Sequence, residues 1–250
     1  MYAINLIEGE GVGTAYEYYT KLRQLKRFIN SIDRPKKVLI AGLPEKYGLS
    51  MDFFLVGQSL NADTVVIDER DGALERAQKA LDILKSGGRF NNKIEFLKTD
   101  NLAEFNKELN KVIFDIALSS EVLQRLDSRR GDYFSCLRNS AKNFALFVPN
   151  RGNQSHAKLS GLNSIHLEEL LRYCRNGVSG MDIYDYGYID MPPFPPGLTR
   201  SQKKREQATE SRIETFLMKG LEIYSLCEEL FPKFIKEKLA HIVYVMVKSR

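Results

Sequence analysis

Up to about residue 180, the apolar side chains alternate between helix-like spacing and strand-like runs. Over residues 14–32 they recur every three or four positions, which predicts a helix that ends before Pro35. The run Lys37–Ala41 is then almost continuously apolar, as expected of a strand buried on both faces. This exchange of strand-like and helix-like stretches continues to about residue 180. It predicts strands at 63–68, 93–98, 114–120 and 143–149, and helices at 72–84, 102–109, 121–140 and 164–174.

Short strands that alternate with helices indicate right-handed crossovers and a mostly parallel sheet. We therefore expect a doubly wound α/β fold with helices on both faces of the sheet. The pattern changes after Gly180, where MDIYDYGYID and the C-terminal LAHIVYVMVK each have the composition of a strand. We expect a single domain over 1–250, with an N-terminal helical extension at 1–35. Residues 191–238 would form a helical insertion before the last strand and act as a lid.

The composition is that of an ordinary globular protein. The chain has 250 residues, 43% hydrophobic and 28% charged, and its net charge of +5 is too small to indicate nucleic acid binding by itself. No signal-peptide pattern and no run of about 18 apolar residues is present, so we expect a cytoplasmic protein without a membrane partner. The cysteines lack metal-ligand spacing, which predicts buried free thiols and no metal site. They are Cys136, Cys174 and Cys227.

The loop after the first predicted strand is unusual for a nucleotide-binding protein. It contains Gly42 and Gly48, and glycine lets the backbone approach a ligand while the next helix offers unpaired N–H groups. Their spacing matches neither GxGxxG nor GxxxxGK[ST]. Pro44 removes one N–H donor, and the negative charge of Glu45 disfavours a phosphate. The loop therefore favours a ligand with less negative charge than a di- or triphosphate.

Carboxylates follow the next two strands, at the positions where open parallel sheets bind ligands. VVIDERD places Asp68 at a strand end with Glu69 beside it, and a carboxylate can accept hydrogen bonds from both hydroxyls of a ribose. KTDN supplies Asp100 and Asn101, where an acid can accept from an exocyclic amine such as that of adenine. The alternative at both places is capping of the helix that follows.

Two further segments extend the pattern to the fourth and fifth strands. FDIALSSEVLQRLD (Phe114–Asp127) is an apolar strand that ends in small polar residues and runs into a Glu-Val-Leu helix start. VPNRGNQSH follows the fifth strand with a Pro-Asn pair and a nearby histidine. Together with the earlier strand ends, these segments resemble the class I S-adenosylmethionine-dependent methyltransferases over roughly residues 14–180. The first loop departs from that family, because its strand ends in Ile40-Ala41 without an acidic residue or closely spaced glycines.

The resemblance implies a Rossmann-like methyltransferase fold with S-adenosyl-L-methionine as the cofactor. Gly42 would lie under the methionine part, and Asp68 would hold the ribose hydroxyls. Asp100 would face the adenine amine, and Ser119 would lie near the reacting methyl group. Glu45 would replace the missing carboxylate near the cofactor's amino group. The full set expected to bind the cofactor is Gly42, Glu45, Gly48, Asp68, Glu69, Asp100, Asn101 and Ser119.

Methyl transfer from a sulfonium needs alignment of the reactants and, for some acceptors, a general base. The candidates on the acceptor side are Glu121, Asn150, His156 and His166, of which His166 lies in the first turn of a predicted helix and is expected to make local contacts. His156 is either the general base or a surface or capping histidine. His241 lies within an apolar strand and is expected to be a satisfied core residue.

The favoured function is a methyltransferase that acts on a small-molecule acceptor. One alternative moves the acceptor to RNA or protein, using the basic run TRSQKKREQ near Lys203. Another is a catalytically inactive binding or scaffold protein, which the atypical first loop suggests. The helix predicted at 201–231 carries an apolar stripe, which packs against the main domain or forms a homodimer.

Overall fold

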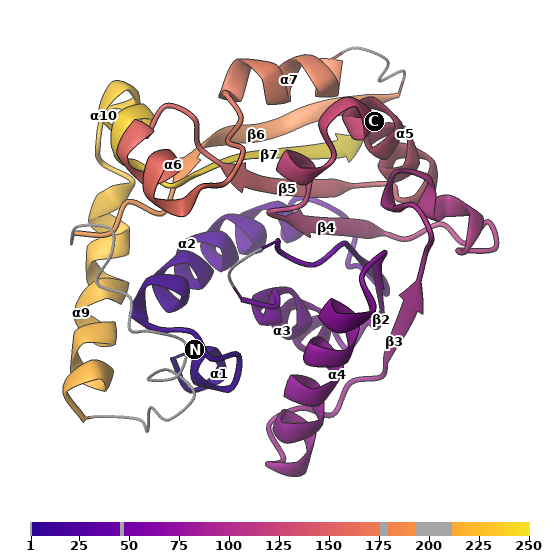
Figure 1. Cartoon of the computed structure of the whole chain (residues 1–250), viewed down its shortest axis with the longest axis horizontal. Helices are drawn as coiled ribbons and strands as arrows, with labels where there is room; N and C mark the ends of the chain where they lie inside the picture. The colour runs from indigo at the N-terminus through magenta and orange to yellow at the C-terminus, as the bar shows by residue number, and fades with distance from the viewer. Residues whose placement is uncertain (1, 46–47, 176–179, 194–211) are drawn as a thin grey trace.

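The sheet is the centre of the molecule. The computed structural model describes residues 2–45, 48–175, 180–193 and 212–250, and their strands form a seven-stranded sheet in the order β3-β2-β1-β4-β5-β7-β6 (Figure 1). Strands β1 to β5 pair in parallel, whereas β7 runs antiparallel to β5 and β6. The expected doubly wound, mostly parallel sheet is confirmed. The strands are β1 (Lys37–Ala41), β2 (Asp63–Asp68), β3 (Ile94–Lys98), β4 (Ile116–Ser120), β5 (Phe144–Pro149), β6 (Met181–Ile189) and β7 (Ile242–Ser249).

The central strands are apolar because both of their faces are covered. All residues of β4 and β5 are buried, and so are those of β1 after Lys37. Strand β1 pairs with β2 on one side and with β4 on the other, so Leu39 lies between Val65 and Ala117. The order of the strands therefore reverses at β1, and this reversal is where doubly wound sheets bind ligands.

The side chains of β1 alternate between two cores, one on each face of the sheet. Val38 and Ile40 pack in a core that includes Leu25 and Phe28 of α2. Leu39 and Ala41 pack on the opposite face in the core that contains η1, α5 and α7. The first face is covered by α2 (Val12–Ile29), α3 (Met51–Leu60) and α4 (Asp71–Ser86), and the second by η1 (Leu102–Lys107), α5 (Arg130–Ser140) and α7 (Leu167–Arg175).

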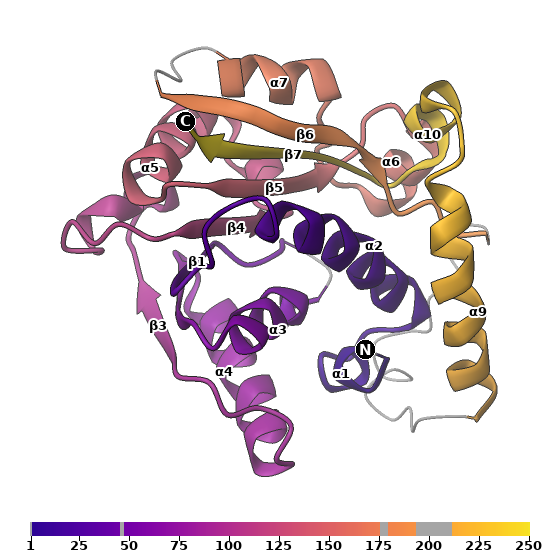
Figure 2. The ribbon, with the colours of Figure 1, turned by 180° about the vertical axis from the view of Figure 1, so that it is seen from behind.

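Two C-terminal helices precede the last strand, and the first of them packs beside α2. Figure 2 shows α9 (Arg212–Glu228) beside α2, and Met218 and Leu221 of α9 pack against Ala15 and Tyr16 of α2. Helix α10 (Lys233–Leu239) then leads into β7. The remaining elements are α1 (Tyr2–Ile7), η2 (Leu123–Arg125), η3 (Asp127–Arg129) and α6 (Gln154–Ser160).

Several local expectations differ from the structure. Helix α6 was not predicted, and the helix expected at 102–109 is a shorter 3-10 turn. Cys136 and Cys174 are buried, but Cys227 is exposed, so the expectation of three buried thiols is wrong for Cys227. TRSQKKREQ and the start of the helix predicted at 201–231 lie outside the described residues. Within the described part of the chain, every helix is too short or too polar to cross a membrane.

Candidate active site

The ends of several strands meet at one edge of the sheet. Parallel strands β1, β2, β4, β5 and β6 all end at this edge, and antiparallel β7 starts there. The chain therefore brings residues distant in sequence to one place. At or next to this edge are Gly42, Asp68, Ser119, Glu121, Asn150, Asp190 and His241.

Gly42 is required by the packing of the loop that follows β1. Its φ of 86° is in the left-handed region, and its N–H donates to the Ile67 carbonyl at 2.8 Å. A Cβ atom at this position would lie 2.7 Å from a methyl group of Val122 and 2.8 Å from one of Leu102. The space above Gly42 is thus filled by two apolar side chains of the protein itself.

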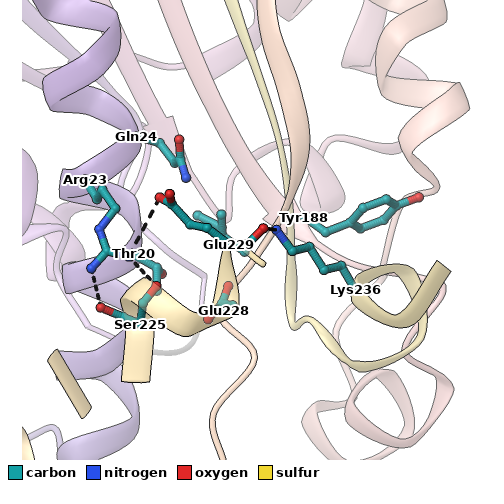
Figure 3. A pocket seen from close by; sticks show the side chains of 9 residues that line it. Thr20, Arg23, Gln24, Tyr188, Ser225, Glu228, Glu229 and Lys236 are labelled. Atoms are coloured by element: carbon teal, nitrogen blue, oxygen red, sulfur yellow. Dashed lines mark hydrogen bonds and ion pairs between the residues drawn. The ribbon is translucent and has the colours of Figure 1, made fainter. Parts of the chain in front are cut away.

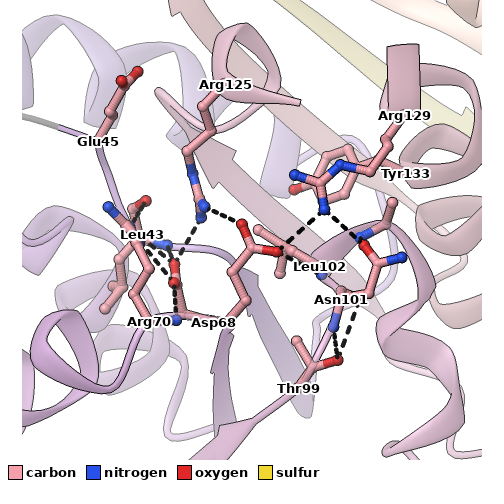
Figure 4. Close-up of polar contacts among 12 residues, drawn as sticks. Leu43, Glu45, Asp68, Arg70, Thr99, Asn101, Leu102, Arg125, Arg129 and Tyr133 are labelled. Atoms are coloured by element: carbon pink, nitrogen blue, oxygen red, sulfur yellow. Dashed lines mark hydrogen bonds and ion pairs between the residues drawn. The ribbon is translucent and has the colours of Figure 1, made fainter. Parts of the chain in front are cut away.

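Asp68 is fully buried and is held by the chain on both carboxylate oxygens (Figure 4). Oδ1 accepts from the backbone N–H and Nε of Arg70, both at 2.9 Å. Oδ2 accepts from Leu43 N at 2.7 Å, Arg70 Nη2 at 3.0 Å and Arg125 Nη2 at 2.9 Å. A carboxylate has about four lone-pair sites, so these donors leave none for a further partner in this arrangement.

The charge of Asp68 is stabilised by the same contacts. Burial by itself would raise the pKa of Asp68, but the hydrogen bonds from Arg70 and the positive charges of Arg125 and Arg70 outweigh it. The pKa of Asp68 therefore lies below its ordinary value, and the residue is ionised at neutral pH. Arg70 also ties this carboxylate to the first loop, because its Nη2 donates to the Leu43 carbonyl at 2.7 Å.

Glu69 continues the network toward η1. Its Oε1 accepts from Arg125 Nη1 at 2.6 Å, and its Oε2 accepts from the Leu102 N–H at 3.1 Å. Arg129 Nη1 lies 3.4 Å from Glu69 Oε2 and 3.0 Å from Asn101 Oδ1. Two arginines that follow β4 therefore occupy the space beside the carboxylates that follow β2.

Asn101 caps η1, as the alternative considered from the sequence predicted. Its Oδ1 accepts from Ala103 N at 3.0 Å, and its Nδ2 donates to Glu104 at 3.1 Å. Asp100 is exposed beside it. Glu45 is also exposed, and its Oε2 lies 3.4 Å from Gln124 Nε2, away from the Asp68 network (Figure 4).

The N-terminal segment covers the start of α3. Glu8 accepts from Leu49 N at 3.2 Å and from Met51 N at 3.1 Å, while Glu10 accepts from Gly48 N at 3.2 Å. These N–H groups precede or begin the helix, where unpaired donors and the helix dipole favour negative charge. Two acidic side chains of the chain itself therefore occupy the N-terminal end of α3.

Lys21 of α2 is a buried cation at the end of β4. Its Nζ lies 2.8 Å from Glu17, 3.1 Å from Asp52 and 3.2 Å from Ser120 Oγ. Burial by itself lowers the pKa of Lys21, but Asp52 and Glu17 outweigh it and raise the pKa above its ordinary value. Lys21 is thus a fixed positive charge. Burial in turn raises the pKa of Glu17 to about 7, although Lys21 opposes this.

Glu121 and Asp190 are two buried carboxyls with left-handed backbones, at φ of 53° and 65°. They are 5% and 4% exposed, and Glu121 interacts electrostatically with Asp190, Glu17 and Lys21. Glu121 Oε2 and Asp190 Oδ1 have no hydrogen-bond partner among the described residues. Burial raises the pKa of Glu121 well above its ordinary value, and the charge of Glu17 adds to this.

The two histidines of this edge stack on each other. The rings of His156 and His241 are 3.9 Å apart between centroids and 13° from parallel, and His241 Nδ1 lies 3.0 Å from Asp190 Oδ2. Burial and the neighbouring His241 lower the pKa of His156 to about 4, so His156 is a weak base. Burial would also lower the pKa of His241, but Asp190 outweighs it and raises the pKa. His241 is thus oriented by a carboxylate, as in a typical general base.

Asn150 and Ser119 are buried and are engaged by the protein itself. Both amide hydrogens of Asn150 are donated, to the Glu237 and Ala240 carbonyls at 2.8 Å each, so Asn150 fixes the end of α10. Ser119 Oγ accepts from Tyr133 OH at 2.7 Å. Neither side chain is directed to open space by these contacts.

A small pocket opens beside this edge, between α2, β6 and the C-terminal helices (Figure 3). Its lining includes Arg23 and Gln24 of α2, Tyr188 of β6, and Glu228 of α9. Glu228 connects the pocket to the edge of the sheet, because it accepts from the Met191 N–H at 3.0 Å and from Tyr16 OH. Met191 follows Asp190 directly in the chain.

The structure therefore brings the predicted residues together in two groups. Gly42, Asp68, Glu69 and Asn101 lie at the ends of β1, β2 and β3, whereas Glu121, Asn150 and His156 lie around the ends of β4 and β5. Sequence reasoning missed Arg125, Lys21, Asp190 and Glu8. Lys21 could have been found from its i,i+4 spacing to Glu17. It predicted His241 to be a satisfied core residue, and the structure gives this histidine Asp190 as its hydrogen-bond partner.

Comparison with solved structures identifies the fold. The methyltransferase domain of bacterial CtHen1-C has a TM-score of 0.55 and 13% identity, covering 93% of this chain and 98% of that one. The plantazolicin methyltransferase BpumL, solved with a pentazolic desmethylPZN analogue and SAH, has a TM-score of 0.57 and 15% identity, covering 94% and 86%. The chain thus has the Rossmann-like fold of class I S-adenosylmethionine-dependent methyltransferases, as the sequence predicted. No family model and no curated protein matches the sequence.

Proposed function

We propose that the protein is an S-adenosylmethionine-dependent methyltransferase that acts on a small-molecule acceptor. One observation carries the proposal: the buried Asp68 carboxylate stands at the end of β2, beside the strand-order reversal. BpumL, which has the same fold, was solved with SAH. The proposal treats residues 1–250 as one methyltransferase-like domain in which 191–238 serve as a lid.

The residues around Asp68 are carboxylates, an amide and glycines at the ends of the strands, and such groups can bind this cofactor. Asp68 would hold the ribose hydroxyls, with Glu69 beside it, and Asn101 and Asp100 would lie toward the adenine. Gly42, Gly48 and Glu45 would border the methionine part, and Ser119 would lie near the methyl group. Ribose binding requires Arg125 and at least one of the Arg70 contacts to release Asp68, because five donors already occupy the lone pairs of the carboxylate.

When bound, the cofactor supplies an activated methyl group on a positively charged sulfur. The tasks of the chain are to align the acceptor with that methyl group, to exclude water and to remove a proton from the acceptor. The His241–Asp190 pair is the group best built for the last task. Glu121 lies in the same cluster, and His156 covers one face of the His241 ring.

Calorimetric titration with S-adenosylhomocysteine tests the proposal. We expect saturable binding to the wild-type protein and binding at least ten times weaker in Asp68→Asn, which keeps the shape of the side chain and removes its charge. The matched control is Asp71→Asn, because Asp71 is an exposed residue at the start of α4. Absence of binding to the wild type at millimolar ligand would overturn the proposal.

An inactive scaffold is the second candidate, because the chain itself fills the positions expected for the cofactor. Val122 and Leu102 contact the position above Gly42, and Arg125 and Arg70 saturate Asp68. The same titration separates the two candidates. The sequence basis for an RNA acceptor, TRSQKKREQ, lies outside the described residues.

A homodimer through α9 is part of the proposal. Apolar side chains are exposed along α9 and its continuation, and they include Phe216 at 76%, Ile223 at 65% and Leu230 at 84% exposure. Phe216 and Ile223 are seven residues apart, so they lie on one face of α9, and Leu230 follows in the turn after the helix. A second copy of this helix is the partner proposed for that face.

A further inference from the structure

Two short helices at one corner of the molecule expose lysines and large apolar side chains together. Helices α6 and α10 lie side by side (Figure 1 and Figure 2), and Asn153 at the start of α6 donates from Nδ2 to the Leu239 carbonyl of α10 at 2.7 Å. A Cβ atom at Gly152 would lie 2.4 Å from the Glu237 carbonyl, so the loop before α6 also approaches α10 closely. The two helices are therefore fixed to each other. We call their exposed lysines and apolar residues the α6–α10 face, which consists of Lys158, Leu159, Lys233, Phe234, Lys238 and Leu239.

The face repeats one pattern three times, because each of its lysines is followed directly by a large apolar residue. The apolar members are well exposed, with Leu159 at 63%, Phe234 at 65% and Leu239 at 53%. Single exposed apolar side chains are normal on a protein surface. Three of them, each next to a lysine and carried by two helices that are bonded together, form one composite surface.

Packing of the two helices does not account for these apolar side chains. Helix α10 is anchored by Ile235, which packs against the core, and by the fully buried Ala240 that follows the helix. Helix α6 ends in the buried Ser160. The exposed apolar residues contribute little to this packing, so the stability of the fold does not require them.

The charge of the face is positive. The exposed charged residues of the two helices are the three lysines of the face and one glutamate, Glu237. Lys233 also lies over the ring of Tyr186 on β6, with its Nζ 5.7 Å from the ring centre. A negatively charged partner is therefore complementary to the face, whereas a second copy of the same face would be repelled.

The apolar members distinguish between the kinds of negatively charged partner. Phosphates of a nucleic acid would pair with the lysines, but aliphatic side chains such as Leu159 and Leu239 offer no ring on which bases stack. A bilayer surface accepts both members of each pair. The apolar side chain enters the boundary of the acyl chains, while the lysine stem extends its ammonium group to the headgroup phosphates.

We propose that the α6–α10 face binds the surface of an anionic lipid bilayer. Each helix has seven residues, so the contact lies in the headgroup region and does not cross the bilayer. The absence of a spanning segment in the sequence, on which the expectation of no membrane partner rested, does not bear on such a contact. The face is joined to the candidate site, because Asn150 at the end of β5 donates to the Glu237 and Ala240 carbonyls.

Flotation of the full-length protein with lipid vesicles tests the proposal. The vesicles contain phosphatidylcholine alone, or phosphatidylcholine with about 30% phosphatidylserine. We expect at least tenfold tighter binding to the vesicles with phosphatidylserine, and loss of this preference in about 0.5 M sodium chloride, which screens the charges. On these vesicles Phe234→Ser and Leu159→Ser should each weaken binding at least fivefold, and Lys238→Gln about fivefold.

The matched controls are Ile83→Ser and Lys79→Gln. Both residues are exposed on α4, away from α6 and α10, and Ile83 is 54% exposed (Figure 1). Neither change should alter vesicle binding. All the substituted side chains are exposed, so each variant should fold.

Three outcomes would overturn the proposal. One is equal binding to both kinds of vesicle, or unchanged binding in both Phe234→Ser and Leu159→Ser. Another is binding of polyuridylate RNA that Lys238→Gln weakens and Leu159→Ser does not, which would assign the face to nucleic acid. The third is a dimer that Leu159→Ser dissociates in analytical ultracentrifugation, which would assign the face to a second copy. No measurement includes S-adenosylhomocysteine, so the result is independent of the methyltransferase proposal.

Discussion

Arg125 bridges Asp68 and Glu69 at the end of β2. Its Nη2 lies 2.9 Å from Asp68 Oδ2, and its Nη1 lies 2.6 Å from Glu69 Oε1. The Arg125 side chain is 10% exposed and that of Asp68 is fully buried. The ribose position of a cofactor and this guanidinium therefore compete for the same carboxylate.

Replacing Arg125 with methionine should separate stability from cofactor binding. The change removes two charge-assisted hydrogen bonds but leaves Asp68 paired with Arg70, so we expect the free energy of unfolding to fall by about 1–3 kcal/mol. Removing the guanidinium that competes for the ribose position should raise the affinity for S-adenosylhomocysteine at least threefold. Urea denaturation and calorimetry measure the two effects.

Arg76→Met on the outer surface of α4 is the control for the loss of an arginine. It should change neither quantity by more than about 0.5 kcal/mol. Weaker binding of S-adenosylhomocysteine to Arg125→Met would contradict the competition and would make Arg125 part of the cofactor site.

Gly42→Ala should be strongly destabilising. The backbone φ of 86° disfavours any residue with a Cβ atom, and that atom would lie 2.7 Å from Val122 and 2.8 Å from Leu102. We expect a loss of about 2–4 kcal/mol in the free energy of unfolding, from backbone strain together with overpacking.

Gly72→Ala in α4 is the matched control, because no atom lies within 4 Å of its Cβ position. It should be neutral or stabilise by up to about 1 kcal/mol. Equal effects of the two changes would show that the loop can move away from Val122 and Leu102.

The sheet could be predicted because its signal is local. The run VLIA after Lys37 has the continuous apolar character of a strand covered on both faces, and the spacing of such runs predicts parallel order. The ends of the strands then place Gly42 and Asp68 at one edge, whatever their distance in sequence. That Asp68 is a strand-end carboxylate was therefore predictable.

The partners of that carboxylate could not be predicted in the same way. Arg125 reaches Asp68 across 57 positions of sequence, and Tyr16 reaches Glu228 across 212. Such contacts depend on how helices pack, which no local pattern records. His241 was taken for a core residue because its neighbours are apolar, but it lies just before the first residue of β7, where its Nδ1 is 3.0 Å from Asp190 Oδ2. An apolar context predicts burial and leaves the hydrogen-bond partner undetermined.

The exposed face of α9 should hold two copies of the chain together. Ile223→Glu puts a charge on the face of α9 that contains Phe216, so it should convert a dimer into a monomer in analytical ultracentrifugation. Glu222→Gln, at an exposed site on the same helix, should leave the dimer intact. A monomeric wild type at 100 µM, or a dimer that survives Ile223→Glu, would contradict the proposal.

Glu8 makes the stability of the N-terminal segment depend on pH. Burial raises the pKa of Glu8 from 4.5 to about 8, although hydrogen bonds from Tyr18, Leu49 and Met51 oppose the shift. Asp52 of α3 and Tyr18 of α2 are the titratable groups that face it. Between pH 4.5 and 8 the folded protein holds a proton on Glu8 that the unfolded chain has released. The contribution of Glu8 to stability is therefore complete below pH 4.5 and is lost as the pH rises through about 8.

Glu8→Gln should reduce this dependence, because glutamine does not titrate. We expect the free energy of unfolding of the wild type, measured in urea from pH 5 to pH 9, to fall as the pH rises and to fall less in Glu8→Gln. Glu17, whose pKa is raised to about 7, contributes in the same direction and keeps a residual slope in the variant. Glu75→Gln, which changes an exposed residue of α4, should keep the wild-type slope. An identical slope in Glu8→Gln and the wild type would mean that Glu8 is ionised in the folded protein, held as a carboxylate by the N-terminus of α3.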